Sequence, residues 1–485
     1  MFFKSSISAA LLAALPFSAV YAGGIVTNTN QSVDFLRNPA RDGAIAIGGV
    51  YYNPAGVAFL NEGFHIGFNW QSVWQTRTAT STNPLYALGV NNAGATTKEY
   101  EGKAKAPFIP SVQAAYNKGK WSFQFNFAIN GGGGKATFDR GLGSFESAVA
   151  QIAYAMKPFG AKGYDALSFM QGRQYYFGFT LGAAYRVTEN LSVYGGLRCL
   201  YGTASYKAKV SDIKVNTDKG LVNFGDFIDG INLNYEKLKG MHETLGALMP
   251  EQYRKAYEQM SAVMPRIAEL EVYRNGVNLQ SDQHGLGFAP IVGVDYKTGN
   301  FNFAAKYEFR TKMSMKNKST VNEAMAIDAV NQFLDGSSVR DDSPALLTLG
   351  AQWSVLPKVR LNAGYHHFFD KDAPKYKGKE KELKHGANEY LGGVEWDVAD
   401  RLTVSGGVQI TNYGMSDAYM SDLSFVVDSW SIGLGAKYKV SEKVAVNAAY
   451  FQTNYGKYTT EMKNKMQNSF TRTNSVVGVG VELDF

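Results

Sequence analysis

The sequence lacks a long hydrophobic run after its first residues. A helix needs roughly 20 mostly apolar residues to cross a bilayer, and no later segment supplies them, which excludes helical spanning. The apolar run near the start, 7–20, follows Lys4 and precedes Val20-Tyr21-Ala22. It is too short for a membrane anchor helix, the alternative interpretation, and this pattern predicts a secretory signal peptide over residues 1–22.

Cysteine and histidine are also scarce. The single cysteine, Cys199, excludes an internal disulfide, and its position in the alternation predicts a small lipid-facing side chain. Six histidines occur without a Gly-x-Ser-x-Gly or His-Glu-x-x-His motif. The glycine run 131–134 lacks the Lys-Ser/Thr of a phosphate-binding loop. We therefore predict a protein that is not an enzyme and that needs no metal or cofactor.

Alternating apolar and polar residues dominate the rest of the chain. In 121–130, Trp, Phe and Ile alternate with Ser, Gln, Asn and Ala, and the terminal run from Val477 to Phe485 repeats the pattern. Successive strand residues point to opposite faces, so such strands separate two solvents. The 30 Phe, 29 Tyr and 6 Trp residues suit aromatic girdles at two membrane interfaces. The pattern predicts an all-β, membrane-spanning β-barrel over residues 63–485.

The alternation predicts fourteen antiparallel strands, an even number typical of bacterial outer-membrane barrels. We place them at 63–76, 106–117, 120–131, 174–187, 190–206, 284–297, 300–313, 344–355, 358–369, 387–398, 401–412, 427–440, 443–455 and 470–485. Six short turns rotate with seven long connections, which include 207–283 and 314–343. Short turns belong to the periplasmic side and long loops to the outside. Charged residues such as Arg198 and Lys306 fall on the lumen face.

Two regions depart from the strand pattern. Residues 23–62 are too apolar for a disordered tail and predict an N-terminal hatch, a plug within the lumen. Helical spacing in the loops 207–283 and 314–343 predicts helical extracellular loops with apolar faces. The faces either pack on each other as a loop core or leave a groove for an apolar ligand, and both interpretations stay open. The groove residues are Leu248, Met249, Tyr253, Tyr257, Met260, Met264, Val330 and Phe333.

Three motifs carry a family resemblance across nearly the whole mature chain. They are Gly43 to Ala46 followed by Asn53-Pro54-Ala55, then 184–193 (AYRVTENLSV), then 342–350 (DSPALLTLG). In this order, with fourteen strands and a plug of this length, the chain resembles the FadL/TodX family of outer-membrane long-chain fatty acid transporters. Pro54 fixes its own φ and restricts Asn53, as a rigid corner of a hatch requires.

The resemblance implies a monomer that takes up hydrophobic compounds passively. Capture would occur in the loop groove, followed by transfer to a lumen pocket beside the hatch and lateral exit at a kinked third strand. The glycines at the end of that strand, Gly131, Gly132, Gly133 and Gly134, either form a kink or only begin a flexible loop. The family's basic pocket residues do not align, so Arg198 and Lys306 are candidates for the ligand carboxylate from lumen phase alone. Pairing with Glu308 is the alternative.

The formal charge of +7 does not indicate a nucleic-acid partner in a secreted barrel. Part of it lies in the lysine-rich loop 371–385, which is either a solvated loop or a contact for lipopolysaccharide phosphates. The terminal Phe485 is the expected signal for the barrel assembly machinery. A general porin for hydrophilic solutes is the alternative function, although a plug and apolar loop helices argue against it.

Overall fold

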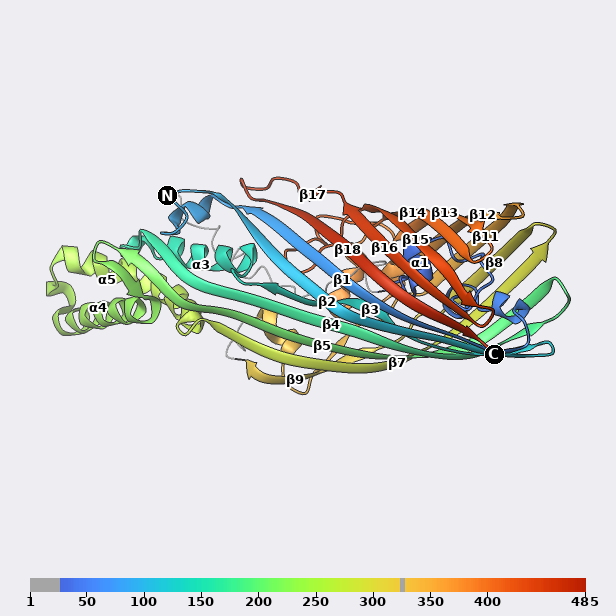
Figure 1. The fold of residues 1–485 in the computed structure, drawn as a ribbon. Helices are drawn as coiled ribbons and strands as arrows, with labels where there is room; N and C mark the ends of the chain where they lie inside the picture. The colour runs from blue at the N-terminus through green and yellow to red at the C-terminus, as the bar shows by residue number, and fades with distance from the viewer. Residues whose placement is uncertain (1–26, 323–327) are drawn as a thin grey trace.

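A computed structural model describes residues 27–322 and 328–485, so the expected signal peptide lies outside it. Within these residues, eighteen strands form one antiparallel sheet, and the pairing of β1 with β18 closes it into a barrel (Figure 1). Four strands, β6, β9, β10 and β17, are short pieces beside the connections. The remaining fourteen described strands make the wall, which confirms the number that the sequence predicts.

The wall strands have these bounds: β1 Gly63–Thr82, β2 Thr97–Lys118, β3 Trp121–Phe138, β4 Gly163–Arg186, β5 Leu191–Thr217, β7 Val277–Thr298, β8 Phe301–Glu308, β11 Leu346–Leu356, β12 Val359–Phe368, β13 Asn388–Ala399, β14 Leu402–Asn412, β15 Ser429–Ser441, β16 Val444–Tyr455 and β18 Gln467–Asp484. The short strands are β6 Gly220–Asn223, β9 Ser314–Asn322, β10 Ser338–Arg340 and β17 Tyr458–Thr459. The α-helices are α1 Val33–Arg37, α2 Gly49–Tyr52, α3 Gly143–Ala155, α4 Phe224–Leu245 and α5 Glu251–Leu270. The 3-10 helices are η1 Gly56–Phe59, η2 Pro84–Leu88, η3 Lys157–Phe159, η4 Gly246–Leu248, η5 Glu271–Tyr273, η6 Asp328–Phe333, η7 Asp370–Asp372 and η8 Tyr376–Glu382.

The wall is longer on one side than on the other. Strands β1 to β5, with β7, run past the shorter β11 to β16 and carry α3, α4 and α5 beyond them (Figure 1). β4 begins at Gly163 rather than at 174, and β5 ends at Thr217 rather than at 206, because the two strands stay paired to Gly163↔Asn216. The sequence boundaries were wrong here because the apolar side chains of this part of β5, such as Ala208, Val210 and Val215, point inward, while lysines cover the outer face.

The two faces of the wall differ as the alternation predicts. On β3, Phe123 is 53% exposed, whereas its neighbour Gln124 is 4% exposed. Exposed aromatics also pair across strands, with ring centroids 4.7 Å apart for Trp121 and Tyr185 and 5.6 Å apart for Phe301 and Trp353. This outward apolar surface around a polar interior is the surface of a transmembrane barrel.

The outer loops form a hydrophobic core of their own on the inner faces of the long strands. Phe145 of α3, Phe224 of α4, Phe333 of η6 and Phe425 of the connection 413–428 are all buried in it. The sequence pattern predicted α5 but not α3 or α4. None of the helices in 27–322 or 328–485 has both the length and the apolar character to cross a bilayer.

Candidate functional site

Residues 28–60 lie inside the barrel, where Figure 1 shows α1, and we call them the lumen segment. Nearly all are buried, and they begin with a helix that Ser32 caps by accepting a hydrogen bond from the Phe35 amide. The Phe35 ring stacks on Tyr52 at 5.9 Å and contacts Phe451 of β16 at 5.6 Å. An apolar segment of this kind is stabilised in the lumen because its side chains are removed from water.

The Asn-Pro-Ala motif joins the lumen segment to three different wall strands. Asn53 Nδ2 donates to Asp295 of β7 at 2.5 Å. The Pro54 carbonyl accepts from Gln124 of β3 at 2.8 Å, and the Ala55 carbonyl accepts from Ser192 of β5 at 2.6 Å. Since Pro54 fixes the backbone, the two carbonyls are held in the directions these bonds require.

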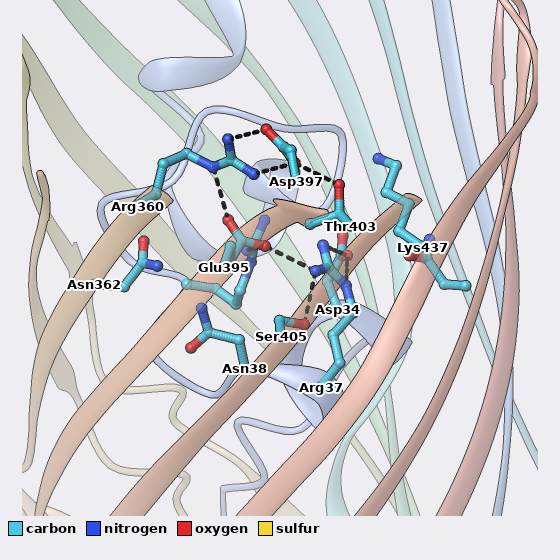
Figure 2. Close-up of polar contacts among 12 residues, drawn as sticks. Asp34, Arg37, Asn38, Arg360, Asn362, Glu395, Asp397, Thr403, Ser405 and Lys437 are labelled. Atoms are coloured by element: carbon cyan, nitrogen blue, oxygen red, sulfur yellow. Dashed lines mark hydrogen bonds and ion pairs between the residues drawn. The ribbon is translucent and has the colours of Figure 1, made fainter. Parts of the chain in front are cut away.

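A buried network of charges joins α1 to the wall on the side of β12 to β15 (Figure 2). Arg37 donates to Asp34 at 2.7 Å, to Glu395 at 2.8 Å and to the Ser405 hydroxyl at 2.9 Å. Arg41 adds a second bond to Glu395 at 2.7 Å. Buried charges are tolerated only when they are paired in this way.

The network continues on the wall itself, toward the short turn between β13 and β14. Arg360 of β12 forms two bonds with Asp397 of β13, at 2.6 and 2.8 Å, and Thr403 donates to the same carboxylate (Figure 2). The second contact of Arg360, from Nε to the Glu395 carboxylate, is longer at 3.5 Å. Arg360 therefore supports the wall more than the lumen segment.

Glycines let the lumen segment approach the wall backbone on this side. A Cβ at Gly433 of β15 would collide with the Leu36 carbonyl, and one at Gly350 of β11 would collide with the Asp42 backbone. The abundance of glycine therefore has a local cause in these strands, because larger residues there would displace the lumen segment.

The pairing between β2 and β3 is interrupted on the opposite side of the wall. The ladder runs from Lys118↔Trp121 to Val112↔Phe127 and resumes only at Lys105↔Lys135. Pro107 and Pro110 lie in this interval and lack the N–H that a ladder needs. We call the interval, residues 106–111 and 128–134, the wall gap.

Backbone geometry marks the β3 edge of the wall gap. Gly132 and Gly134 have φ of +84° and +88°, a region that favours glycine. The register with β4 shifts twice, between Ile129 and Gly131 and again before Gly134. The freed edge of β3 is met by the lumen segment, since the Asn28 amide donates to the Asn130 carbonyl at 2.8 Å.

A cavity that is partly open to solvent lies between the lumen segment and the wall. Its lining includes Asn28, Thr29 and Phe35 of the lumen segment and Gly132 and Gly134 of the wall gap. The inner faces of β1, β14, β15, β16 and β18 complete it with apolar side chains and with neutral hydroxyls and amides. We call it the lumen cavity. It suits a largely apolar ligand and reaches the wall gap.

The candidate carboxylate ligands from the sequence, Arg198 and Lys306, lie outside this lining and already contact an acid. Arg198 bonds Glu308, and Lys306 Nζ lies 2.7 Å from the other oxygen of the same carboxylate. Lys306 also donates to the Tyr51 carbonyl at 2.6 Å. Their geometry matches the alternative of a wall ion pair, and a role with a ligand stays a prediction. The sequence already indicated this ion pair, because Glu308 is two residues from Lys306 and therefore lies on the same face of the strand.

The predicted groove residues divide into buried and exposed groups. Met249, Val330 and Phe333 are buried, and the Phe333 ring contacts Tyr206 at 5.4 Å. Met260 and Met264 pack partly buried against the same core, and Tyr257 stacks on Tyr235 and His242. Leu248 and Tyr253 are exposed at the end of the α4–α5 hairpin. The loop-core interpretation therefore describes most of these side chains, and the capture role stays a prediction.

Glu146 of α3 organises the polar part of the outer loops. Its carboxylate accepts bonds from Lys98 at 2.6 Å, Tyr100 at 2.6 Å and Asn92 at 2.7 Å. Burial opposes ionisation, but these bonds, first of all the one from Lys98, hold the pKa of Glu146 below its ordinary value. The carboxylate therefore ties α3 to the start of β2 and to the connection before it.

Solved structures with the same fold are known. A FadL homologue of Pseudomonas aeruginosa is 12% identical with a TM-score of 0.64, and the alignment covers 96% of this chain and 100% of that one. The toluene transporter TodX of Pseudomonas putida is 12% identical with a TM-score of 0.56, and the alignment covers 96% of this chain and 100% of that one. The Ralstonia pickettii toluene transporter TbuX is 14% identical with a TM-score of 0.51, and the alignment covers 95% of this chain and 97% of that one. No protein-family model and no curated protein matches the sequence.

The chain has the FadL/TodX fold. The similarity extends over the lumen segment as well as the wall, because the alignments cover nearly all of each chain. A fourteen-stranded barrel of this fold with an exposed apolar band is an outer-membrane protein of bacteria. The sequence resemblance, based on short motifs, therefore predicted the fold correctly although overall identity is low.

Proposed function

We propose that this FadL/TodX-fold barrel takes up hydrophobic compounds passively across the outer membrane, and that its substrates include long-chain fatty acids. One observation carries the proposal: the lumen cavity is bounded on one side by the lumen segment and on another by the wall gap. A ligand in this cavity has a side route out of the barrel that does not require the lumen segment to leave.

The route follows from the solvents that the ligand meets. Each CH₂ group gains roughly 0.8 kcal/mol on leaving water for an apolar site, so an acyl chain is stabilised in the cavity. Exit through the wall gap would place that chain in the membrane without exposing it to water. The outer loops, with Leu248 and Tyr253 exposed at their end, are the proposed point of capture. The names of the similar structures, a FadL homologue and two toluene transporters, agree with a hydrophobic substrate.

Uptake in cells tests the proposal. A strain that expresses the protein should accumulate a fluorescent long-chain fatty acid faster than the deletion strain, and the purified barrel should bind the same probe. Toluene serves as the neutral aromatic comparison. Equal uptake by the two strains, together with no binding of either probe to the barrel, would reject the function.

A general porin is the alternative. The lumen segment and the buried loop core leave no reason to expect a wide aqueous path, so a planar-bilayer recording of the purified barrel should be nearly silent. Large steady conductance would favour the porin and contradict the plugged transporter.

A further inference from the structure

Three cations on the outer face of the long strands lie directly opposite one another. Lys105 of β2 is opposite Lys135 of β3 in the strand register, and Lys135 is in turn opposite Arg173 of β4. All three side chains are exposed. Like charges at opposite positions of neighbouring strands repel, so this arrangement is unfavourable in the protein alone. We call the three residues the cationic row.

The protein itself does not neutralise the cationic row. Within residues 27–322 and 328–485, no carboxylate lies within 4.0 Å of Lys105, Lys135 or Arg173. Glu101, an exposed acid of β2, already contacts Lys103 at 3.2 Å. The row therefore has an excess of positive charge that an external anion can balance.

The positive charge continues onto the next strand. Lys207 and Lys209 of β5 are exposed on the same face of the wall. The residues opposite them on β4 and β7 are all uncharged: Gln171, Phe169, Gln280 and Asn278. Four neighbouring strands thus present cations at one level of the wall, a density that attracts anionic groups.

The cationic row begins where the apolar band of the wall ends. Lys105 is opposite the exposed Trp74 of β1, and beyond Trp74 the same face of β1 carries only threonines, at positions 76, 78, 80 and 82. Tyr175 is two residues from Arg173 on the same face of β4. The strand extensions and α3 to α5 lie beyond the row (Figure 1), so it is at the outer side of the membrane.

We propose that the cationic row binds the phosphate groups of lipopolysaccharide in the outer leaflet. This lipid matches both parts of the surface, because its acyl chains cover the apolar band at Trp74 while its phosphates meet Lys105, Lys135 and Arg173. Ammonium and guanidinium groups form charge-assisted hydrogen bonds with phosphate, and the guanidinium can form two at once. Since Lys105 and Lys135 are the first pair of the ladder beyond the wall gap, the bound lipid lies at the outer end of that gap. The inference does not depend on the proposed transport function.

The test measures binding of lipid A, the phosphorylated anchor of lipopolysaccharide, to the purified barrel in detergent by native mass spectrometry. The comparison probe is the same lipid A with both phosphates removed. Each cation near an anionic lipid surface contributes about 5-fold in affinity, so K105Q/K135Q/R173Q should bind phosphorylated lipid A roughly 100-fold more weakly than wild type. Its affinity for the dephosphorylated lipid should stay within about 3-fold, and the wild-type preference for phosphate should shrink as salt is added.

The control variant removes the same number of charges from the periplasmic end. K118Q/K120Q/K443Q replaces exposed lysines at the β2–β3 and β15–β16 turns, two of them on or beside the strands that carry the cationic row. It should bind both forms of lipid A as wild type does. Equal losses in the two triple variants would show an effect of net charge alone and would overturn the site.

Stability provides a readout that a merely structural role would move the other way. Because the three cations repel one another, the lipid-free K105Q/K135Q/R173Q variant should unfold at the same temperature as wild type or at a higher one, as followed by heat-dependent mobility on gels. Phosphorylated lipid A should raise the unfolding temperature of wild type but not of this variant. If the triple variant does not fold, K105Q/K135Q replaces it in both assays.

Three results would contradict the proposal. The first is equal binding of phosphorylated lipid A by wild type and the cationic-row variant. The second is an absence of preference for the phosphorylated form in wild type. The third is displacement of lipid A by inorganic phosphate alone at the same concentration, which would indicate a site for a free anion rather than for a lipid.

Discussion

Replacing Arg37 with glutamine should detach the lumen segment from the wall. The side chain makes bonds to Asp34, Glu395 and Ser405 in a site where both carboxylates are nearly inaccessible, at 5% and 6% side-chain exposure. In R37Q, Asp34 loses its bonded cation, while Glu395 keeps Arg41 at 2.7 Å. Breaking a buried pair by removing one partner costs about 3–5 kcal/mol. At about 1.4 kcal/mol per tenfold, the detached population should rise by roughly 10² to 4 × 10³.

The matched control is R360Q, in the same network. Arg360 is 25% exposed, its partner Asp397 keeps the bond from Thr403, and neither residue belongs to the lumen segment. Its loss should cost only about 1 kcal/mol because solvent screens the pair. Ion conductance in planar bilayers and protease cleavage within residues 28–60 measure detachment. R37Q should show intermittent channel openings and faster cleavage, and R360Q neither. If the two variants behave alike in both assays, the reasoning about the buried network is refuted.

Three further predictions concern the wall gap and the outer loops. Gly132→Ala forces a Cβ at φ +84° against the β4 backbone, and it should slow uptake at least 10-fold while binding changes less than 3-fold. Gly119→Ala is strained at φ +58° but lies in open space, and it should leave uptake unchanged. Equal uptake by the two variants would contradict an exit at the gap. Because the pKa of Glu146 is lowered in the folded protein, its stabilisation is present above the unfolded pKa of about 4.5 and is lost as pH falls through the lowered folded pKa. The difference in hydrogen exchange of α3 between E146Q and wild type should therefore be largest at pH 7 and shrink steadily as the pH is lowered below about 4.5. Phe333 is buried, so Phe333→Ala should destabilise the loop core by about 3–5 kcal/mol in thermal unfolding. Leu248 is 84% exposed, so Leu248→Ala should cost less than about 0.5 kcal/mol. Similar losses in the two variants would contradict the burial of Phe333 in the loop core.

The membrane part of the wall was predictable because alternation reports two solvents, lipid outside and polar groups inside. The boundaries were missed where β4 and β5 extend further, because the apolar face of β5 there points inward. Ala208, Val210 and Val215 are buried in the loop core, and lysines cover the outer face. α4 was missed for a related reason: it buries Phe224, Ile228 and Ile231 only near its start, and the rest of the helix is mostly in water. Where packing does not require apolar residues at helical spacing, a sequence pattern cannot predict the helix.

The site was predictable in its parts but not in its pairings. The apolar residues of 23–62 indicated a segment that must be buried, and Asp34, Arg37 and Arg41 within it were a signal of charged contacts that remained unused. Glu395, the acid that pairs with both arginines, is more than 350 positions away in sequence. Which wall acid pairs with Arg37 and Arg41 depends on how far along the barrel axis α1 lies.

The contacts of the lumen segment are unequal on the two sides of the barrel, and this inequality fits passive transport. On the β12 to β15 side, Arg37 and Arg41 hold Glu395 through buried ion pairs. At the wall gap the segment is held by neutral bonds, from the Asn28 amide to the Asn130 carbonyl and from the Ser111 hydroxyl to the Gln31 carbonyl. Each neutral bond is worth about 0.5–1.5 kcal/mol net, within reach of the apolar stabilisation of a few CH₂ groups. In the proposed function, a ligand would displace the segment's edge at the gap while the ion pairs keep the rest of it in the lumen, and opening the route would need no external energy source.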